Sequence, residues 1–147
     1  MWYKGIFLYL ATVLDLYTRE ILGWHILTAH TSELVHNTLT EALHTNKAPP
    51  KIHHSDQGSE YRSKEYTGFL KGLGVRISMS RQGSPWENGY QEAFYSQFKV
   101  DLGDPIRFET RGELVYEIHK TIYWYNHERI HSALKMPPSV FARRMEG

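Results

Sequence analysis

The chain opens with two apolar runs separated by a short turn. Positions 6–14 are almost wholly apolar, and positions 19–27 are rich in apolar residues. The segment Asp15-Leu16-Tyr17-Thr18 between them begins with Asp, a residue that commonly starts turns. Two apolar runs joined in this way predict an antiparallel β-hairpin.

From Thr31 onward the apolar residues are spaced as on one face of a helix. The residues that recur at this spacing are Leu34, Val35, Thr38, Leu39, Ala42 and Leu43. Thr31 and Ser32 precede them as candidate N-caps, and the pair Pro49-Pro50 follows as a stop signal. We therefore predict an amphipathic helix that begins near Thr31 and ends before Pro49.

After the two prolines, short strands alternate with helices. We predict strands over 51–54 and 75–79, and helices over about 63–71, 87–100 and 111–125. Gly72 and Gly74 end the first of these helices, and segment 80–85, which contains Gly83, is predicted to be a mobile loop. The order of elements predicts an α/β fold with a mixed sheet flanked by helices.

Length and composition favour a single domain. The chain has 147 residues, of which 41% are hydrophobic and 14% aromatic, enough for one core. Asp101 to Pro105 is the weakest boundary, so we predict a core over residues 1–104 and a C-terminal helical extension of the same domain over 105–147. The sequence has neither an apolar run of membrane-spanning length nor a signal-peptide pattern, so we expect a cytoplasmic protein.

The absence of cysteine restricts the chemistry of the chain. It excludes a disulfide framework and a cysteine-based zinc site, and it leaves nine histidines and sixteen acidic residues as metal ligands. The formal net charge of +1 neither demands nor excludes a nucleic-acid partner, because the local distribution of charge matters more than its sum.

Two carboxylates and one lysine are candidates for chemistry. Asp56 directly follows a predicted strand, at the end of the strand where mixed sheets collect active-site groups, although the local pattern also fits a residue that caps a turn. Glu92 and Lys99 are seven residues apart, which places both on one face of a helix. Such a face can hold a metal ion and a phosphate, but taken alone the pair also fits an ordinary solvated helix face.

The segments around these residues resemble one family. Residues 53–61 (HHSDQGSEY), 78–83 (SMSRQG) and 87–94 (ENGYQEAF) are similar to the core of bacterial insertion-sequence transposases related to retroviral integrases. The opening segment 9–20, the tail 123–131 and the following Pro137-Pro138 resemble the same family. The 35 residues between Asp56 and Glu92 also match the family's spacing between its second and third carboxylates.

The resemblance implies a ribonuclease H-like fold in which an Asp, Asp, Glu triad binds two Mg²⁺ ions, with Mn²⁺ able to substitute. Asp56 is then the second carboxylate, Glu92 the third, and Lys99 a DNA contact, while Arg62, Arg81 and Asn88 are further candidate DNA contacts. The implied function is metal-dependent cleavage and strand transfer of DNA during transposition. The implied full-length protein is a nucleoid-associated homo-oligomer.

One carboxylate of the family's triad has no counterpart here. The family's first aspartate lies on a strand before the one that begins near Ile6, and Asp15 falls at a non-catalytic position, so we predict Asp15 to be a turn residue. We expect the sheet to lack its first strand and to have unpaired backbone groups beside the second strand. We also expect the chain to be inactive by itself. Two accounts fit the missing aspartate. The chain is either an excerpt or mis-started frame of an active transposase, or a remnant that retains the fold, weak DNA binding or oligomer contacts.

A competing motif lies in the tail. His127-Glu128-Arg129-Ile130-His131 matches HExxH, in which two histidines bind zinc and the glutamate acts as a base. The motif needs a long regular helix and a third ligand. We therefore keep a zinc hydrolase as a remote alternative.

Overall fold

The structure is a computed structural model that describes residues 1–29, 31–45, 52–55, 64–79 and 89–145. Asp56, Arg62, Arg81 and Asn88 lie outside the described residues, as does the predicted loop over 80–85.

The predicted hairpin is confirmed. β3 (Tyr9–Leu14) and β4 (Ile21–Leu27) pair antiparallel, with Tyr9 opposite Leu27. In the turn between them, Oδ1 of Asp15 accepts hydrogen bonds from the backbone N–H groups of residues 17 and 18, at 2.9 Å and 3.0 Å. The predicted turn role of Asp15 is therefore also confirmed.

A second, smaller hairpin precedes the first. β1 (Trp2–Tyr3) pairs antiparallel with β2 (Ile6–Phe7), which begins the apolar run that continues into β3. Lys4 and Gly5 between them have φ of 45° and 84°, positive at both positions as in a type I′ turn. The sequence pattern did not predict this hairpin.

The remaining strands are parallel. β5 (Ile52–Ser55) pairs with β6 (Arg76–Met79), so antiparallel and parallel pairs occur together as the mixed-sheet prediction required. Within the described ranges β3 pairs only with β4 and β5 only with β6. The edge of β3 away from β4 has no strand partner in those ranges.

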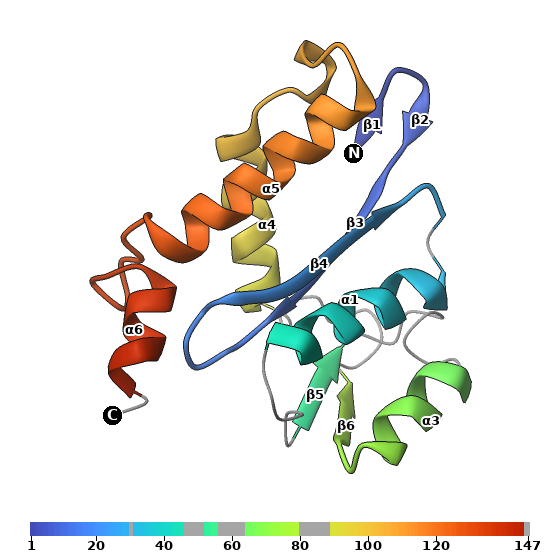
Figure 1. Cartoon of the computed structure of the whole chain (residues 1–147), viewed down its shortest axis with the longest axis vertical. Helices are drawn as coiled ribbons and strands as arrows, with labels where there is room; N and C mark the ends of the chain where they lie inside the picture. The colour runs from blue at the N-terminus through green and yellow to red at the C-terminus, as the bar shows by residue number, and fades with distance from the viewer. Residues whose placement is uncertain (30, 46–51, 56–63, 80–88, 146–147) are drawn as a thin grey trace.

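Helices cover both faces of the β3–β4 hairpin (Figure 1). α1 (Ser32–Thr45) lies on one face, with α3 (Lys64–Gly72) beyond it. α4 (Gly89–Leu102) and α5 (Arg111–His127) lie on the other face, joined by the short 3-10 helix η2 (Pro105–Arg107) and followed by α6 (Pro138–Met145). No helix in these ranges has the length and apolar character needed to cross a membrane.

The two faces have separate cores. The larger core joins the start of the chain and the hairpin to α4 and α5; its buried members include Leu8, Ile21, Phe94, Phe98, Leu114, Ile118 and Ile122. The smaller core lies between α1, α3 and the start of β6, and comprises Val35, Leu39, Tyr66, Leu70 and Val75. Because strand side chains alternate between faces, the hairpin contributes to both sides.

Gly23 allows α1 to lie against β4. A Cβ atom at this position would be 2.6 Å from the backbone nitrogen of Ala42 and 2.6 Å from the backbone oxygen of Thr38. Only a residue without a side chain permits this approach, so Gly23 fixes how closely the helix packs on the hairpin.

Hydrogen bonds between distant parts of the chain join α5 to the hairpin, and join the C-cap residue of η2 to β1. The side-chain amide of Asn126 donates to the oxygen of Ile21 at 2.9 Å and accepts from its N–H at 2.8 Å, as a neighbouring strand would. The Tyr125 hydroxyl donates to the backbone oxygen of Arg19 at 2.9 Å, and the Tyr3 hydroxyl donates to that of Phe108 at 3.1 Å. These bonds connect residues more than 100 positions apart.

Candidate active site

α4 carries the two predicted site residues that the structure describes. Glu92 lies in its first turn and Lys99 in its last, and both side chains are exposed. Their spacing of two helical turns places them on one face, as predicted. A carboxylate near the N-terminus and an ammonium near the C-terminus each interact favourably with the helix dipole.

The Glu92 carboxylate is free to bind a ligand. Within the described ranges it has no hydrogen bond or ion pair, and the one ion pair found there joins Lys120 to Glu117. An exposed carboxylate that has no protein partner keeps both oxygens available as ligands for a hard cation. Lys99 lies close enough to the N-terminal ammonium of Met1 to lower the pKa of that group, after the larger effect of burial.

The two parallel strands end on the same side of their sheet. β5 ends at Ser55, directly before Asp56, and its parallel partner β6 ends at Met79. Parallel strands have their carboxyl ends at one edge, so the chain leaves both strands at the same edge before it enters α4 at Gly89. The roles of Asp56, Arg62, Arg81 and Asn88 stay predictions, because these residues lie outside the described ranges.

A polar network that sequence reasoning missed attaches the start of α4 to β3. The Thr12 hydroxyl donates to Oε1 of Gln91 at 3.0 Å and lies 2.9 Å from the Tyr95 hydroxyl. Nε2 of Gln91 donates to the Thr12 backbone oxygen at 3.3 Å, and the Tyr95 hydroxyl donates to that of Leu10 at 3.3 Å. The residue directly before Glu92 is therefore fixed on the hairpin.

Tyr95 serves this network as a neutral hydroxyl. Burial raises the pKa of Tyr95 above its ordinary value, while its hydrogen bonds with Thr12 act in the opposite direction. The phenol therefore stays protonated at neutral pH and can donate. α4 is thus fixed on the strand by donors and acceptors whose state does not change near pH 7.

The geometry of the tail does not suit the zinc motif. α5 ends at His127 and Glu128 is its C-cap, so His131 is not on the same helix. His131 instead forms an isolated β-bridge with Met136, and Nδ1 of His127 lies 2.9 Å from the Ser139 hydroxyl. Among the described residues, no three His, Asp or Glu side chains form a metal-binding group. The zinc-hydrolase alternative is therefore wrong, because it requires both histidines on one regular helix.

His131 predicts a pH dependence of stability. Burial, followed by the positive charges of Arg19 and Arg129, lowers the pKa of His131. The unfolded chain therefore takes up this proton more readily than the folded one, and stability should fall as the pH drops through about 6.5. We expect His131→Asn, which keeps an acceptor for the Ala133 N–H, to lose less thermal stability than the wild type between pH 7.5 and 5.5. Equal losses in both proteins would contradict this.

Two family models described as integrase core domain match the chain, one over residues 1–85 and one over residues 73–138. The chain is 40% identical over 129 residues to the transposase for insertion sequence element IS904 of Lactococcus lactis subsp. lactis (strain IL1403), covering 86% of this chain and 51% of the relative. The chain spans about half the length of the relatives it matches.

Solved integrases have the same fold. The simian T-cell lymphotropic virus intasome, solved with a PP2A regulatory subunit, matches with a TM-score of 0.82 at 17% identity over 95% of this chain and 49% of that chain. The HTLV-2 integrase catalytic core domain in complex with magnesium matches with a TM-score of 0.78 at 16% identity over 95% of this chain and 87% of that chain. The predicted ribonuclease H-like α/β fold is therefore confirmed.

The family model that matches residues 1–85 covers more than half of the 147 residues, and the relative from Lactococcus lactis is a transposase for an insertion sequence. The resemblance seen in the sequence is thereby confirmed, and the chain belongs to the integrase core domain family.

Proposed function

We propose that this chain is the catalytic core of an insertion-sequence transposase whose complete form cleaves DNA at the element ends and joins the 3′-hydroxyl to target DNA. The observation that carries the proposal is the exposed Glu92 carboxylate on α4, which has no partner in the described part of an integrase core chain. The relative from Lactococcus lactis, a transposase for an insertion sequence, supports transposition as the context.

Asp56 and Glu92 hold Mg²⁺ in this proposal, and Mn²⁺ substitutes for it. The donor set fits, because carboxylate oxygens are the ligands that hard divalent cations prefer. The HTLV-2 integrase core was solved in complex with magnesium, which supports the choice of metal. The metal supplies charge stabilisation at the attacking and leaving oxygens of the phosphodiester.

The other residues bind and orient DNA. Lys99, on the same face of α4 as Glu92, offers an ammonium to a phosphate, and Arg62, Arg81 and Asn88 flank the two carboxylates in sequence. Thr12, Gln91 and Tyr95 hold α4 on β3, so they position Glu92 without touching DNA.

The assembly is proposed from the same comparisons. DNA is the partner, and the full-length protein is a homo-oligomer that acts at the bacterial nucleoid. The HTLV-2 core has been described in trimeric and dimeric forms, which supports self-association. We assign residues 105–147 to the same domain as 1–104, because buried residues of α5 share one core with those of α4.

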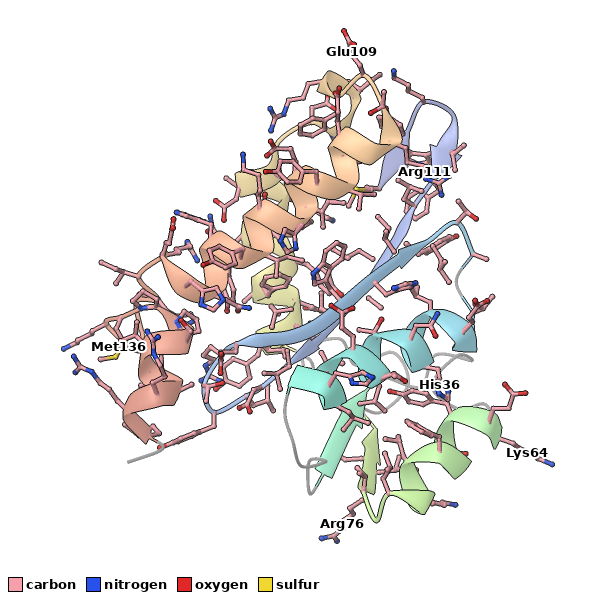
Figure 2. The ribbon with its side chains drawn as sticks, viewed as in Figure 1. His36, Lys64, Arg76, Glu109, Arg111 and Met136 are labelled. Carbon is pink, nitrogen blue, oxygen red and sulfur yellow. The ribbon has the colours of Figure 1, made fainter. Side chains whose placement is uncertain are left out.

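A DNA-nicking assay in the presence of Mg²⁺ tests the catalytic assignment. The complete form is incubated with duplex DNA with and without the metal, and Asp56→Asn and Glu92→Gln should each reduce metal-dependent nicking to background. Glu109→Gln is the matched control, since Glu109 is also exposed but lies at the far end of α5 (Figure 2). Nicking that survives in both site variants would contradict the proposal.

A non-catalytic chain that keeps the fold and binds DNA weakly is the second candidate. This candidate predicts measurable DNA binding and no metal-dependent nicking in the same assay.

A further inference from the structure

Arg19 occupies a strained position in the β3–β4 turn. Its φ is +65°, in the left-handed region that residues other than Gly, Asn and Asp seldom adopt. Such a conformation costs of order 1 kcal/mol and persists only where surrounding contacts fix it. Strained residues of this kind are common at functional sites, which suggests a functional role for the side chain of Arg19.

Contacts from three directions fix the turn. The Arg19 N–H donates to the Asp15 backbone oxygen at 2.7 Å, and the Arg19 oxygen accepts from the Tyr125 hydroxyl of α5 at 2.9 Å. The Tyr17 ring packs against Phe141 of α6, with ring centroids 5.5 Å apart. Figure 1 shows this turn beside α6 and the C-terminal end of α5. The Arg19 backbone is therefore preorganised.

The turn directs the Arg19 guanidinium onto the start of α4. Its carbon lies 3.9 Å from the centroid of the Tyr90 ring, two residues before Glu92. Stacking on an aromatic ring fixes the plane of a guanidinium and leaves its N–H edges available to an acceptor. Arg19 thus presents a fixed cation at the first turn of α4, the turn that also carries Glu92.

The hydrogen-bonding capacity of Arg19 is not fully used. One terminal nitrogen donates to the Leu16 backbone oxygen, while Nε is buried and has no hydrogen-bond partner in the described part of the chain. No described carboxylate forms an ion pair with Arg19. Because Nε is buried, a phosphate would meet the terminal nitrogens of the guanidinium and not Nε.

A second cation lies close by. Arg129 follows the C-cap of α5, and its guanidinium carbon is 5.9 Å from the centroid of the Trp124 ring. The charges of Arg19 and Arg129 both act on Tyr125 and on His131, so the two arginines share one neighbourhood. Two like charges in one neighbourhood reinforce each other's attraction for an anion.

We propose that Arg19, with Arg129 beside it, binds a DNA phosphate at the N-terminal end of α4. This inference rests on the proposed function, because DNA supplies the phosphate. A planar guanidinium matches the oxygens of a phosphodiester better than an ammonium does. The site lies at the helix turn that carries Glu92, whereas Lys99 lies in the last turn of the same helix.

The test measures binding of a short labelled duplex by fluorescence anisotropy in EDTA, so that the metal site does not contribute. Arg19→Asn removes the guanidinium but suits a positive φ, so the fold should be retained. Arg111→Asn is the matched control: it removes the same charge at the first residue of α5, about 25 Å along that helix from its C-terminal end. Figure 2 shows Arg111 at the opposite end of α5 from Met136.

Arg19→Asn should weaken binding by about tenfold at low salt, as expected for the loss of a charged hydrogen bond. It should also reduce the slope of log Kd against log salt by about 0.9, the value for one phosphate contact. Arg129→Gln should act in the same direction, whereas Arg111→Asn should leave both quantities near those of the unaltered chain. Unfolding midpoints measured on each variant separate loss of contact from loss of fold.

Equal binding by the Arg19 and Arg111 variants would overturn the inference and leave the proposed function standing. Failure of the unaltered chain to bind DNA even at low salt would overturn the inference together with DNA as the partner.

Discussion

Replacing Gly23 with alanine is expected to destabilise the fold by about 3 kcal/mol, at the upper end of the usual range for overpacking. The new Cβ would lie 2.6 Å from two backbone atoms of α1, at Thr38 and Ala42. Backbone atoms cannot turn aside as a flexible side chain can, so the whole helix must move away from β4. Urea unfolding monitored by circular dichroism measures the change.

The control is the same substitution at Gly68. This glycine lies inside α3, and a Cβ there meets no atom within 4 Å. Alanine has a higher helix propensity than glycine, so Gly68→Ala should stabilise the protein by about 0.5–1 kcal/mol. The same substitution of glycine by alanine is thus expected to lower the free energy of unfolding at position 23 and to raise it at position 68. An unchanged midpoint for Gly23→Ala would show that α1 does not lie as close to β4 as described.

The second large effect is expected for Ile118→Ala. Ile118 is 0% exposed in α5 and belongs to the core that also holds α4. Truncation should cost about 3 kcal/mol, from the lost burial and the cavity that remains. Because Phe94 and Phe98 of α4 pack in the same core, the cavity should also loosen the packing of the helix that carries Glu92.

Ile130→Ala provides the matched comparison. Ile130 is 69% exposed, so its truncation should change the free energy of unfolding by no more than about 0.5 kcal/mol. Similar losses for both variants would mean that α5 does not bury the face that contains Ile118.

Most of the regular elements could be predicted from the sequence because their patterns are local. The two apolar runs predict β3 and β4, and the helical spacing after Thr31 predicts α1. The predicted helix over 87–100 forms over Gly89–Leu102, and that over 111–125 extends to His127. Helix ends depend on capping contacts, which periodicity does not specify.

Two elements escaped prediction because they depend on contacts that periodicity does not show. The β1–β2 turn places Lys4 at positive φ, which lysine rarely adopts. α6 has only eight residues, and it is held by contacts of Ser139 with His127 and of Phe141 with Tyr17. The partners of these last two residues lie 12 and 124 positions away along the chain, so a local pattern cannot reveal them.

In the candidate site, too, local spacing could be predicted and long-range contacts could not. The helix face with Glu92 and Lys99 follows from their spacing, whereas the Thr12 network joins residues 79 and 83 positions apart. A threonine within an apolar strand was the available signal, but it does not identify its partner. The HExxH motif does not form a zinc site, because a spacing of four implies a shared face only inside a helix and α5 ends at its first histidine.

The bonds that join the hairpin to α5 also determine how this protein is made. Arg19 and Ile21 meet partners 106 and 105 residues later, near the end of α5, so the ribosome must synthesise α5 before these bonds can form. At ordinary synthesis rates that interval is about 5–20 s. During it the nascent hairpin exposes the apolar face that α4 and α5 later cover.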